Sequence, residues 1–265
     1  MTKTILITGA TDGIGLETAK MLAPLGHTLL LHGRNPDKLA AAATAVSGRD
    51  GAGTIETYRA DLTDLAEVVA KADKIKSAYD SLDVLINNAG VFKMSDPVTR
   101  DGYDARFIVN LVAPYQLTKA LLPLIGPSGR VVNLSSAAQA PVNLEAFLTK
   151  QILPDGEAYA QSKLALTMWS AEMANELGAN GPVIVAVNPA SFLASKMVKE
   201  AYGHDGHDLR IGADILTRAA LSDEFADASG RYYDNDRKAF AQPHPDALDL
   251  AKNKRVVAAL DQLIK

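Results

Sequence analysis

Residues 4–15 read TILITGATDGIG, a short apolar run followed by glycines at positions 9, 13 and 15. The apolar run predicts a buried strand, and the glycines predict a tight turn that opens a helix. Gly9 permits the turn, Gly13 lets the backbone approach a pyrophosphate, and Gly15 allows close packing of the helix on the sheet. The free N–H groups of the helix N-terminus also favour a phosphate. An ordinary glycine-rich turn is the alternative, because the spacing is Gly-x-x-x-Gly-x-Gly and not Gly-x-Gly-x-x-Gly.

Short β-rich runs alternate with longer amphipathic segments along the rest of the chain. Strands are expected at residues 4–8, 28–32, 54–60, 82–87, 130–136, 182–188 and 230–236. Helices are expected at residues 13–24, 36–47, 64–79, 103–125, 156–178, 211–222 and 246–260. Nearly continuous apolar runs indicate strands that are buried on both faces of a parallel sheet. The pattern predicts one α/β domain over residues 1–265, a doubly wound Rossmann fold whose seven-stranded parallel sheet is flanked by helices.

The composition excludes several classes of protein. The 265 residues are 48% hydrophobic, carry a net charge of −4 and include no cysteine. No basic excess indicates a nucleic-acid partner, no apolar run reaches the length of a membrane span, and disulfides and thiolate metal sites are excluded. The histidines and aspartates of GHDGHD (203–208) fit a polar loop better than a metal site. We therefore expect a soluble cytoplasmic protein with no metal, no nucleic-acid partner and no membrane.

The end of the second predicted strand bears on the choice of cofactor. The sequence LHGRN (31–35) places Gly33 where an acidic residue would bind the ribose hydroxyls of NAD, and Arg34 follows. A guanidinium can hold a 2′-phosphate through two parallel hydrogen bonds. The residues therefore predict a preference for NADP(H), with NAD(H) as the other cofactor that the site can take. The alternatives are that Arg34 pairs with a surface carboxylate, and that Asp12 disfavours the phosphate.

Four motifs occur in order: TGATDGIG (8–15), NNAG (87–90), LSS (134–136) and YAQSK (159–163). With them the chain resembles the classical short-chain dehydrogenase/reductase family over nearly its whole length. The long segment 137–158 before Tyr159 resembles the subgroup of retinol dehydrogenases and WW-domain oxidoreductases. The resemblance implies an oxidoreductase that interconverts a carbonyl and an alcohol by hydride transfer.

The resemblance implies four catalytic residues: Asn110, Ser136, Tyr159 and Lys163. Free tyrosine has a pKa near 10, and a nearby ammonium favours the phenolate. The spacing i, i+4 places Tyr159 and Lys163 on one helix face, so the tyrosine can act as proton donor or acceptor. Ser136, with Ser135 as the competing choice, holds the substrate oxygen, and Asn110 binds the water of a proton relay. Without the other motifs, a half-buried aromatic residue and a solvated lysine would be the simpler interpretation.

The resemblance also implies the residues that bind the cofactor. They are Gly9, Thr11, Asp12, Gly13, Ile14, Gly15, Arg34, Asn35, Asp61, Leu62, Asn88, Ala89, Gly90, Tyr159, Lys163, Pro189, Ser191 and Ser195. Two positions depart from the family. The usual Pro-Gly is Pro189-Ala190, and the threonine expected after it is replaced by Ser195, with Ser191 as the other candidate.

Two long loops, residues 137–157 and 190–210, are expected to form the substrate pocket. Their apolar side chains predict a hydrophobic substrate: Ala138, Pro141, Val142, Phe147, Phe192, Leu193, Met197 and Tyr202. By analogy with the family, we expect a homodimer or homotetramer that forms through the helices at 103–125 and 156–178. The alternatives are an epimerase or dehydratase that uses bound NAD, and a non-catalytic NADP(H)-sensing regulatory protein. The motif NNAG (87–90) argues against an epimerase or dehydratase, and the presence of all four catalytic residues argues against a regulatory protein.

Overall fold

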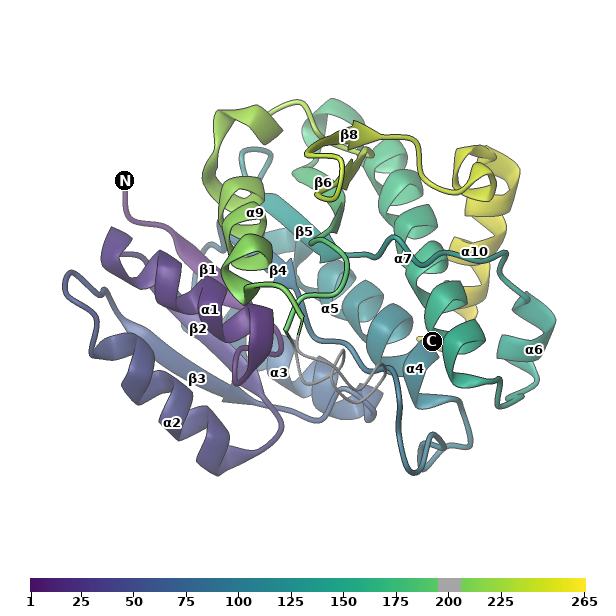
Figure 1. Ribbon diagram of the computed structural model, residues 1–265, viewed down its shortest axis with the longest axis horizontal. Helices are drawn as coiled ribbons and strands as arrows, with labels where there is room; N and C mark the ends of the chain where they lie inside the picture. The colour runs from purple at the N-terminus through teal and green to yellow at the C-terminus, as the bar shows by residue number, and fades with distance from the viewer. Residues whose placement is uncertain (195–205) are drawn as a thin grey trace.

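The computed structural model describes residues 1–194 and 206–265. Its strands form one sheet in the order β3-β2-β1-β4-β5-β6-β7-β8 (Figure 1). The strands are β1 Thr4–Ile7, β2 Thr28–Gly33, β3 Ile55–Arg59, β4 Val84–Asn87, β5 Arg130–Leu134, β6 Val183–Asn188, β7 Tyr232–Asp234 and β8 Ala239–Ala241. The strand order reverses between β1 and β4, where doubly wound sheets bind their ligands. The α/β class and the doubly wound arrangement are confirmed.

The predicted count of seven strands is wrong by one. Strands β1 to β7 pair in parallel, and β8 is an additional edge strand that runs antiparallel to β7. It has three residues and follows a turn in which Lys238 has a φ of 52°. Its central residue, Phe240, packs edge-to-face on Tyr233 with 5.1 Å between ring centroids. A strand this short carries no alternating pattern that a sequence could reveal.

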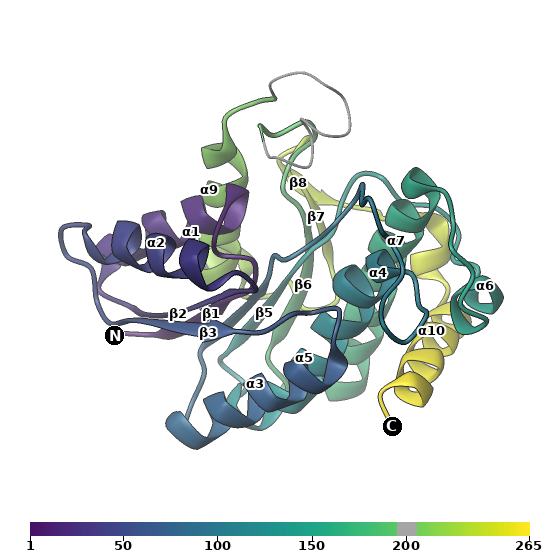
Figure 2. The ribbon, with the colours of Figure 1, turned by 90° about the horizontal axis from the view of Figure 1, so that it is seen from below.

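Helices cover both faces of the sheet (Figure 2). The helices are α1 Gly13–Leu22, α2 Pro36–Ser47, α3 Leu65–Ala78, α4 Ala105–Phe107, α5 Ala113–Leu121, α6 Leu144–Leu148, α7 Asp155–Leu177, α9 Leu209–Leu221 and α10 Leu250–Leu263. One face carries α1, α2 and α9; the other carries α3, α5 and α7, with α10 outside α7. The single helix expected at 103–125 is interrupted by a π-helical turn over Ile108–Val112.

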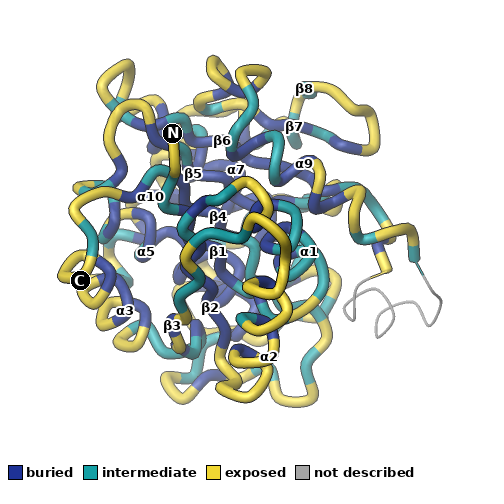
Figure 3. The backbone as a smooth tube through the Cα atoms, turned by 90° about the vertical axis from the view of Figure 1, so that its left-hand side faces the viewer, coloured by how far each residue is buried: buried dark blue, intermediate teal, exposed yellow. Residues whose placement is uncertain are grey.

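Alternation along each strand explains why the strand sequences are continuously apolar. Ile5 and Ile7 belong to the core beneath α1 and α9, whereas Leu6 belongs to the core beneath α3, α5 and α7. All three side chains are fully buried, and the strands form the buried centre of the molecule in Figure 3. Complete burial of one such side chain contributes about 1.5–3 kcal/mol to stability.

The C-terminal helix α10 packs on α7 and α5. Asp261 accepts hydrogen bonds from the Tyr115 hydroxyl at 2.7 Å and from the Lys119 ammonium at 2.6 Å. Helix α10 therefore covers part of the surface through which subunits were expected to associate, and the homo-oligomer stays a prediction. The expectation that no apolar run reaches the length of a membrane span is wrong for Ala105–Leu124, which is apolar and long enough to cross a membrane. However, 67% of its most apolar window is buried inside the protein, as in a core helix.

Candidate active site

A cleft of about 1300 Å³ lies at the carboxyl ends of the central strands, across the switch point between β1 and β4. Most of the predicted site residues line it: Gly9, Thr11, Asp12, Gly13, Ile14, Arg34, Asn35, Asp61, Leu62, Asn88, Ala89, Gly90, Ser136, Tyr159, Lys163, Pro189 and Ser191. Gly15 and Asn110 are not among the lining residues, and Ser195 lies outside the described residues. Residues from distant parts of the chain are thus brought into one site.

The glycine-rich turn is too crowded for side chains at two positions. A Cβ on Gly9, whose φ is +66°, would lie 2.9 Å from Ala89 Cα, and a Cβ on Gly15 would lie 2.3 Å from the Gly9 carbonyl oxygen. Asn88 donates from Nδ2 to the carbonyls of Thr8 and Gly9 at 2.9 and 3.0 Å, so this side chain anchors the turn. The turn places the N-terminus of α1 at the cleft, where its free N–H groups can bind a pyrophosphate.

The rim of the cleft beside β2 carries two basic side chains. Arg34 and Lys38 are both exposed and both line the cleft. Lys38 was not among the predicted site residues, although it lies in the first turn of α2, four residues after Arg34. Nearby, His32 is buried, accepts a hydrogen bond from Gly9 N at 3.2 Å and has Nε2 3.0 Å from the Ala60 carbonyl. Burial lowers the pKa of His32 well below its ordinary value, which keeps the imidazole neutral.

Tyr159 and Lys163 lie one helical turn apart on α7. The Lys163 ammonium is 2.6 Å from the Leu134 carbonyl oxygen and 5.7 Å from the centroid of the Tyr159 ring. Burial lowers the pKa of Lys163 to about 8. The Tyr159 ring packs edge-to-face on Phe92, with 4.9 Å between centroids. The phenol is therefore held beside a buried cation.

The two adjacent serines have different surroundings. Ser135 is 3% exposed, and its hydroxyl lies 2.7 Å from the hydroxyl of Thr167 and 3.3 Å from the Lys163 carbonyl oxygen. Ser136 is less buried, and its hydroxyl accepts a hydrogen bond from Ala138 N at 3.1 Å. That hydroxyl keeps its proton for a ligand in the cleft. Both serines line the cleft, and the choice of Ser136 as the catalytic serine stays a prediction.

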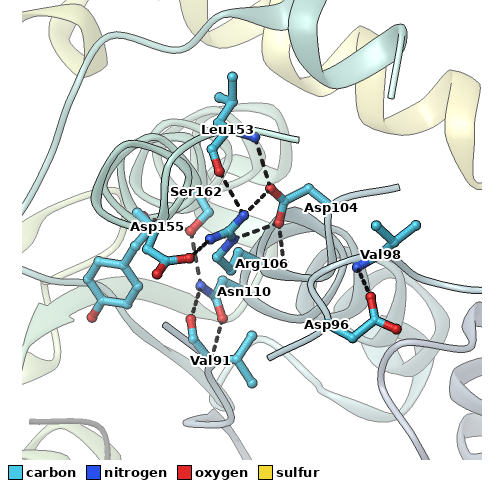
Figure 4. A network of polar contacts seen from close by, with 10 residues as sticks. Val91, Asp96, Val98, Asp104, Arg106, Asn110, Leu153, Asp155 and Ser162 are labelled. Atoms are coloured by element: carbon cyan, nitrogen blue, oxygen red, sulfur yellow. Dashed lines mark hydrogen bonds and ion pairs between the residues drawn. The ribbon is translucent and has the colours of Figure 1, made fainter. Parts of the chain in front are cut away.

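Asn110 lies behind the cleft, at the centre of the π-helical turn. Its Oδ1 accepts from Val91 N at 2.8 Å, and its Nδ2 donates to Val91 O at 2.9 Å and to Ser162 Oγ at 3.1 Å (Figure 4). The side-chain amide is therefore occupied by the protein. π-Helical turns often occur at functional sites, and the role of Asn110 in a proton relay stays a prediction.

The loop that starts at Pro189 is held by the turn between β7 and β8. The Asp236 carboxylate accepts hydrogen bonds from Ser191 N at 2.8 Å, Ser191 Oγ at 2.6 Å and Asn188 Nδ2 at 2.9 Å. Burial would raise the pKa of Asp236, but these hydrogen bonds outweigh it and the pKa is lowered. Ala190, at the position where the family has glycine, adopts a φ of 115°. No sequence motif marks this anchoring role of Asp236.

The two predicted substrate loops contribute unequally to the cleft. Ala138, Phe192 and Leu193 line it, whereas Pro141, Val142 and Phe147 do not. Phe147 is a core residue, 3% exposed, that packs on Phe107 with 5.2 Å between ring centroids, so its predicted place in the pocket is wrong. Met197, Tyr202, His204 and Asp205 lie outside the described residues. Among the described residues, no group of three or more His, Asp or Glu side chains is placed to hold a metal ion.

The chain is similar to known dehydrogenases over most of its length. The family model for short chain dehydrogenase matches residues 3–205. Retinol dehydrogenase 13 from Homo sapiens is 29% identical over 99% of this chain and 84% of its own length. A crystal structure of an uncharacterised protein from Mycobacterium paratuberculosis has a TM-score of 0.81 and 29% identity, covering 99% of this chain and 93% of its own. A short chain dehydrogenase from Shigella flexneri, complexed with NADP, has a TM-score of 0.70 and 27% identity, covering 88% and 97%.

Proposed function

The chain belongs to the short-chain dehydrogenase family and is an oxidoreductase, and we propose that it interconverts a carbonyl compound and an alcohol with NADP(H) as the preferred cofactor. A carbonyl compound, NADPH and one proton give an alcohol and NADP⁺. The observation that carries the proposal is the convergence of Ser136, Tyr159 and Lys163 with the glycine-rich turn in one cleft. A binding protein has no use for a proton donor beside a buried cation.

The chain's own residues fit a nicotinamide dinucleotide. Because no side chain fits at Gly9 or Gly15, the backbone of the turn stays accessible to a pyrophosphate. Asp61 and Leu62 would hold the adenine, Arg34 and Lys38 the 2′-phosphate, and Lys163 the nicotinamide ribose. Pro189, Ala190 and Ser191 would cover the nicotinamide, with Ser191 offering its lone pairs because its proton goes to Asp236. When bound, the cofactor supplies a hydride to the carbonyl carbon or takes it back.

The protein supplies the proton and fixes the reacting oxygen. The Tyr159 hydroxyl donates its proton to the carbonyl oxygen as the alcohol forms, and the Lys163 ammonium stabilises the phenolate that remains. The Ser136 hydroxyl donates a hydrogen bond to the same oxygen. Asn110 and its π-helical turn hold the water that returns a proton through Lys163. In the opposite direction, the Tyr159 phenolate accepts the proton of the alcohol.

The reaction is tested by a screen of ketones, aldehydes and alcohols with NADPH and NADP⁺, followed by Tyr159→Phe. We expect the variant to lose about 10²- to 10⁴-fold in kcat, the usual contribution of a positioned acid or base. NADPH binding, followed by cofactor fluorescence, should stay close to the wild type because the ring is retained. Apolar substrates should be preferred, in keeping with Ala138, Phe192 and Leu193 and with the relative named for retinol. Tight NADPH binding without any turnover would favour the NADP(H)-sensing alternative.

The cofactor preference is tested by Arg34→Ala and Lys38→Ala. Each should weaken NADPH by roughly 10- to 100-fold, the range for a hydrogen bond to a charged group, and should leave NADH nearly unchanged. Arg49→Ala, an exposed arginine just after the other end of α2, is the matched control. Equal losses for NADPH and NADH would contradict the assignment of the 2′-phosphate to this rim.

A further inference from the structure

A buried arginine joins the segment before α7 to the start of α4 (Figure 4). The Arg106 side chain is 1% exposed. Its guanidinium donates to both carboxylate oxygens of Asp104, from Nε at 2.8 Å and from Nη2 at 2.6 Å. Nη2 also donates to the Leu153 carbonyl at 2.9 Å. Because the planar fork has fixed donor directions, these bonds define where the remaining nitrogen, Nη1, points.

Arg106 Nη1 donates to Oδ1 of Asp155, the first residue of α7. The Asp155 side chain is 42% exposed and lines the cleft beside Gly156. Asp155 precedes Tyr159 by four residues, so the two side chains lie on the same face of α7. Oδ2 of Asp155 accepts no hydrogen bond from the described residues. The arginine therefore fixes one oxygen of this carboxylate and leaves the other available to a ligand.

The charges of this group do not cancel. Asp104, Arg106 and Asp155 together carry two negative charges and one positive charge. The Asp104 side chain is 1% exposed and is paired in the bidentate manner, so the uncompensated charge resides on Asp155. The N-terminus of α7 offsets part of it. What remains is a hydrogen-bond acceptor with negative charge, oriented by the protein, one helical turn from the predicted proton donor.

We propose that Asp155 determines substrate specificity by accepting a hydrogen bond from a hydroxyl or ammonium group of the substrate. Arg106 and Asp104 act as positioning residues for this carboxylate. The inference rests on the proposed carbonyl reduction and narrows its substrate to a largely apolar carbonyl compound that carries one hydrogen-bond donor. A carboxylate built to receive such a donor rejects the analogue that lacks it, because the charge is then left desolvated and unpaired.

The substitution Asp155→Asn tests this role with almost no change of shape. Arginine can only donate, so Oδ1 of the asparagine must face Arg106 and its Nδ2 must face the cleft. The acceptor for the substrate is thereby replaced by a donor. The probes are 4-hydroxy-, 4-amino- and 4-methylcyclohexanone with the 3-substituted isomers, compared by kcat/KM with NADPH. The wild type should prefer the hydroxy or amino ketones by ~10- to 100-fold over the methyl ketone.

In Asp155→Asn the preference for the amino ketone should disappear, because an ammonium can only donate, whereas the hydroxy ketone can accept from Nδ2 and should keep part of its preference. The methyl ketone should keep its kcat/KM to within about 2-fold. Preference for the amino ketone alone indicates charge recognition, and preference for both donors indicates hydrogen bonding. Asp96→Asn, a cleft-lining carboxylate that bonds Val98 N and no arginine, is the matched control and should change none of the ratios. A uniform loss for all ketones with a lowered melting temperature would mean a structural role only, and would overturn the proposal.

Equilibrium binding separates this inference from the proposed reaction. Calorimetry of the NADP⁺-loaded protein with 4-amino-, 4-hydroxy- and 4-methylcyclohexanol should show the same donor preference, and Asp155→Asn should abolish the preference for the amino compound, which can only donate. If no ketone is reduced but this selective binding is seen, the proposed reaction fails and the role of Asp155 stands. If the methyl compounds are reduced and bound as well as the donors, or if no donor compound binds or reacts, the role of Asp155 is refuted.

Discussion

Lys71 offers a sharp test of the electrostatics of this fold. It lies on α3, is 4% exposed, and its ammonium finds no hydrogen-bond partner among the described residues. Its neighbours along the helix, Val68, Ala72 and Ile75, are core residues. Burial lowers the pKa of Lys71 from 10.5 to about 7. We predict that Lys71→Met, which keeps an unbranched chain and removes the charge, stabilises the protein at neutral and acidic pH.

The sign and the size of this change in stability follow from proton linkage. Between about pH 7 and pH 10.5 the unfolded chain holds the Lys71 proton and the folded chain has lost it, so the free energy of unfolding of the wild type rises with pH. The difference between these pKa values, at ~1.36 kcal/mol per pH unit, gives a penalty of ~5 kcal/mol that is fully present below pH 7. Lys71→Met should therefore exceed the wild type by ~5 kcal/mol at pH 6, with the advantage shrinking towards zero near pH 10.

Urea unfolding, followed by circular dichroism at several pH values from 6 to 10, measures this difference. Lys76→Met on the same helix is the control, because its ammonium is partly exposed and pairs with Asp73; it should change the free energy of unfolding by less than ~1 kcal/mol at every pH. Equal stability of Lys71→Met and wild type at pH 6 would refute the reasoning. The reasoning would also be refuted if the free energy of unfolding of Lys71→Met rose between pH 7 and pH 10 as much as that of the wild type.

Three further predictions concern the backbone and the C-terminal helix. Ala190→Gly should raise stability by ~1 kcal/mol, seen as a rise of ~2 °C in the melting temperature, because a φ of 115° is costly for alanine; a lowered melting temperature would contradict the strain. Gly15→Ala should destabilise by ~3 kcal/mol and weaken NADPH binding, because its Cβ would meet the Gly9 carbonyl oxygen at 2.3 Å; Gly156→Ala, with no atom within 4 Å, is the control in thermal unfolding and cofactor titration. Truncation before Leu250 should uncover the core that Val256 and Leu260 help to form and cause self-association, measured by light scattering; a truncated monomer of unchanged stability would show that α10 is dispensable.

The sequence predicted most of the fold because its signals are local. A capping residue marks the start of several helices, as Asn35, Asp64 and Asp249 do, and α2 begins and ends where the pattern predicted. What it could not predict depends on tertiary contacts. The π-helical turn at Asn110 leaves the apolar pattern of its helix intact, and β8 exists because a turn returns the chain to pair with Tyr233.

The site residues also divide into those that a local sequence motif reveals and those that depend on tertiary contacts. The glycine-rich turn, Ser136, Tyr159 and Lys163 carry sequence motifs, and the structure places Ser136, Tyr159 and Lys163 with Gly9 and Gly13 around one cleft. Asp236 and Arg106 carry none, because their importance comes from what they contact: a loop 45 residues earlier in one case and a helix start 49 residues later in the other. A phenylalanine in a loop, such as Phe147, looks the same in sequence whether it lines a pocket or fills the core.

Two buried lysines show why a shifted pKa alone does not identify a site. Burial lowers the pKa of both Lys71 and Lys163, and each lies on a helix that packs on the sheet. Lys163 has a carbonyl oxygen at 2.6 Å, an aromatic ring beside it and an opening on the cleft, so its charge can act on a ligand. Lys71 has no such partner among the described residues and does not line the cleft, so its charge only costs stability. Because the surroundings differ, removing the charge at position 71 should make the protein more stable, whereas removing the charge at position 163 should make it less active.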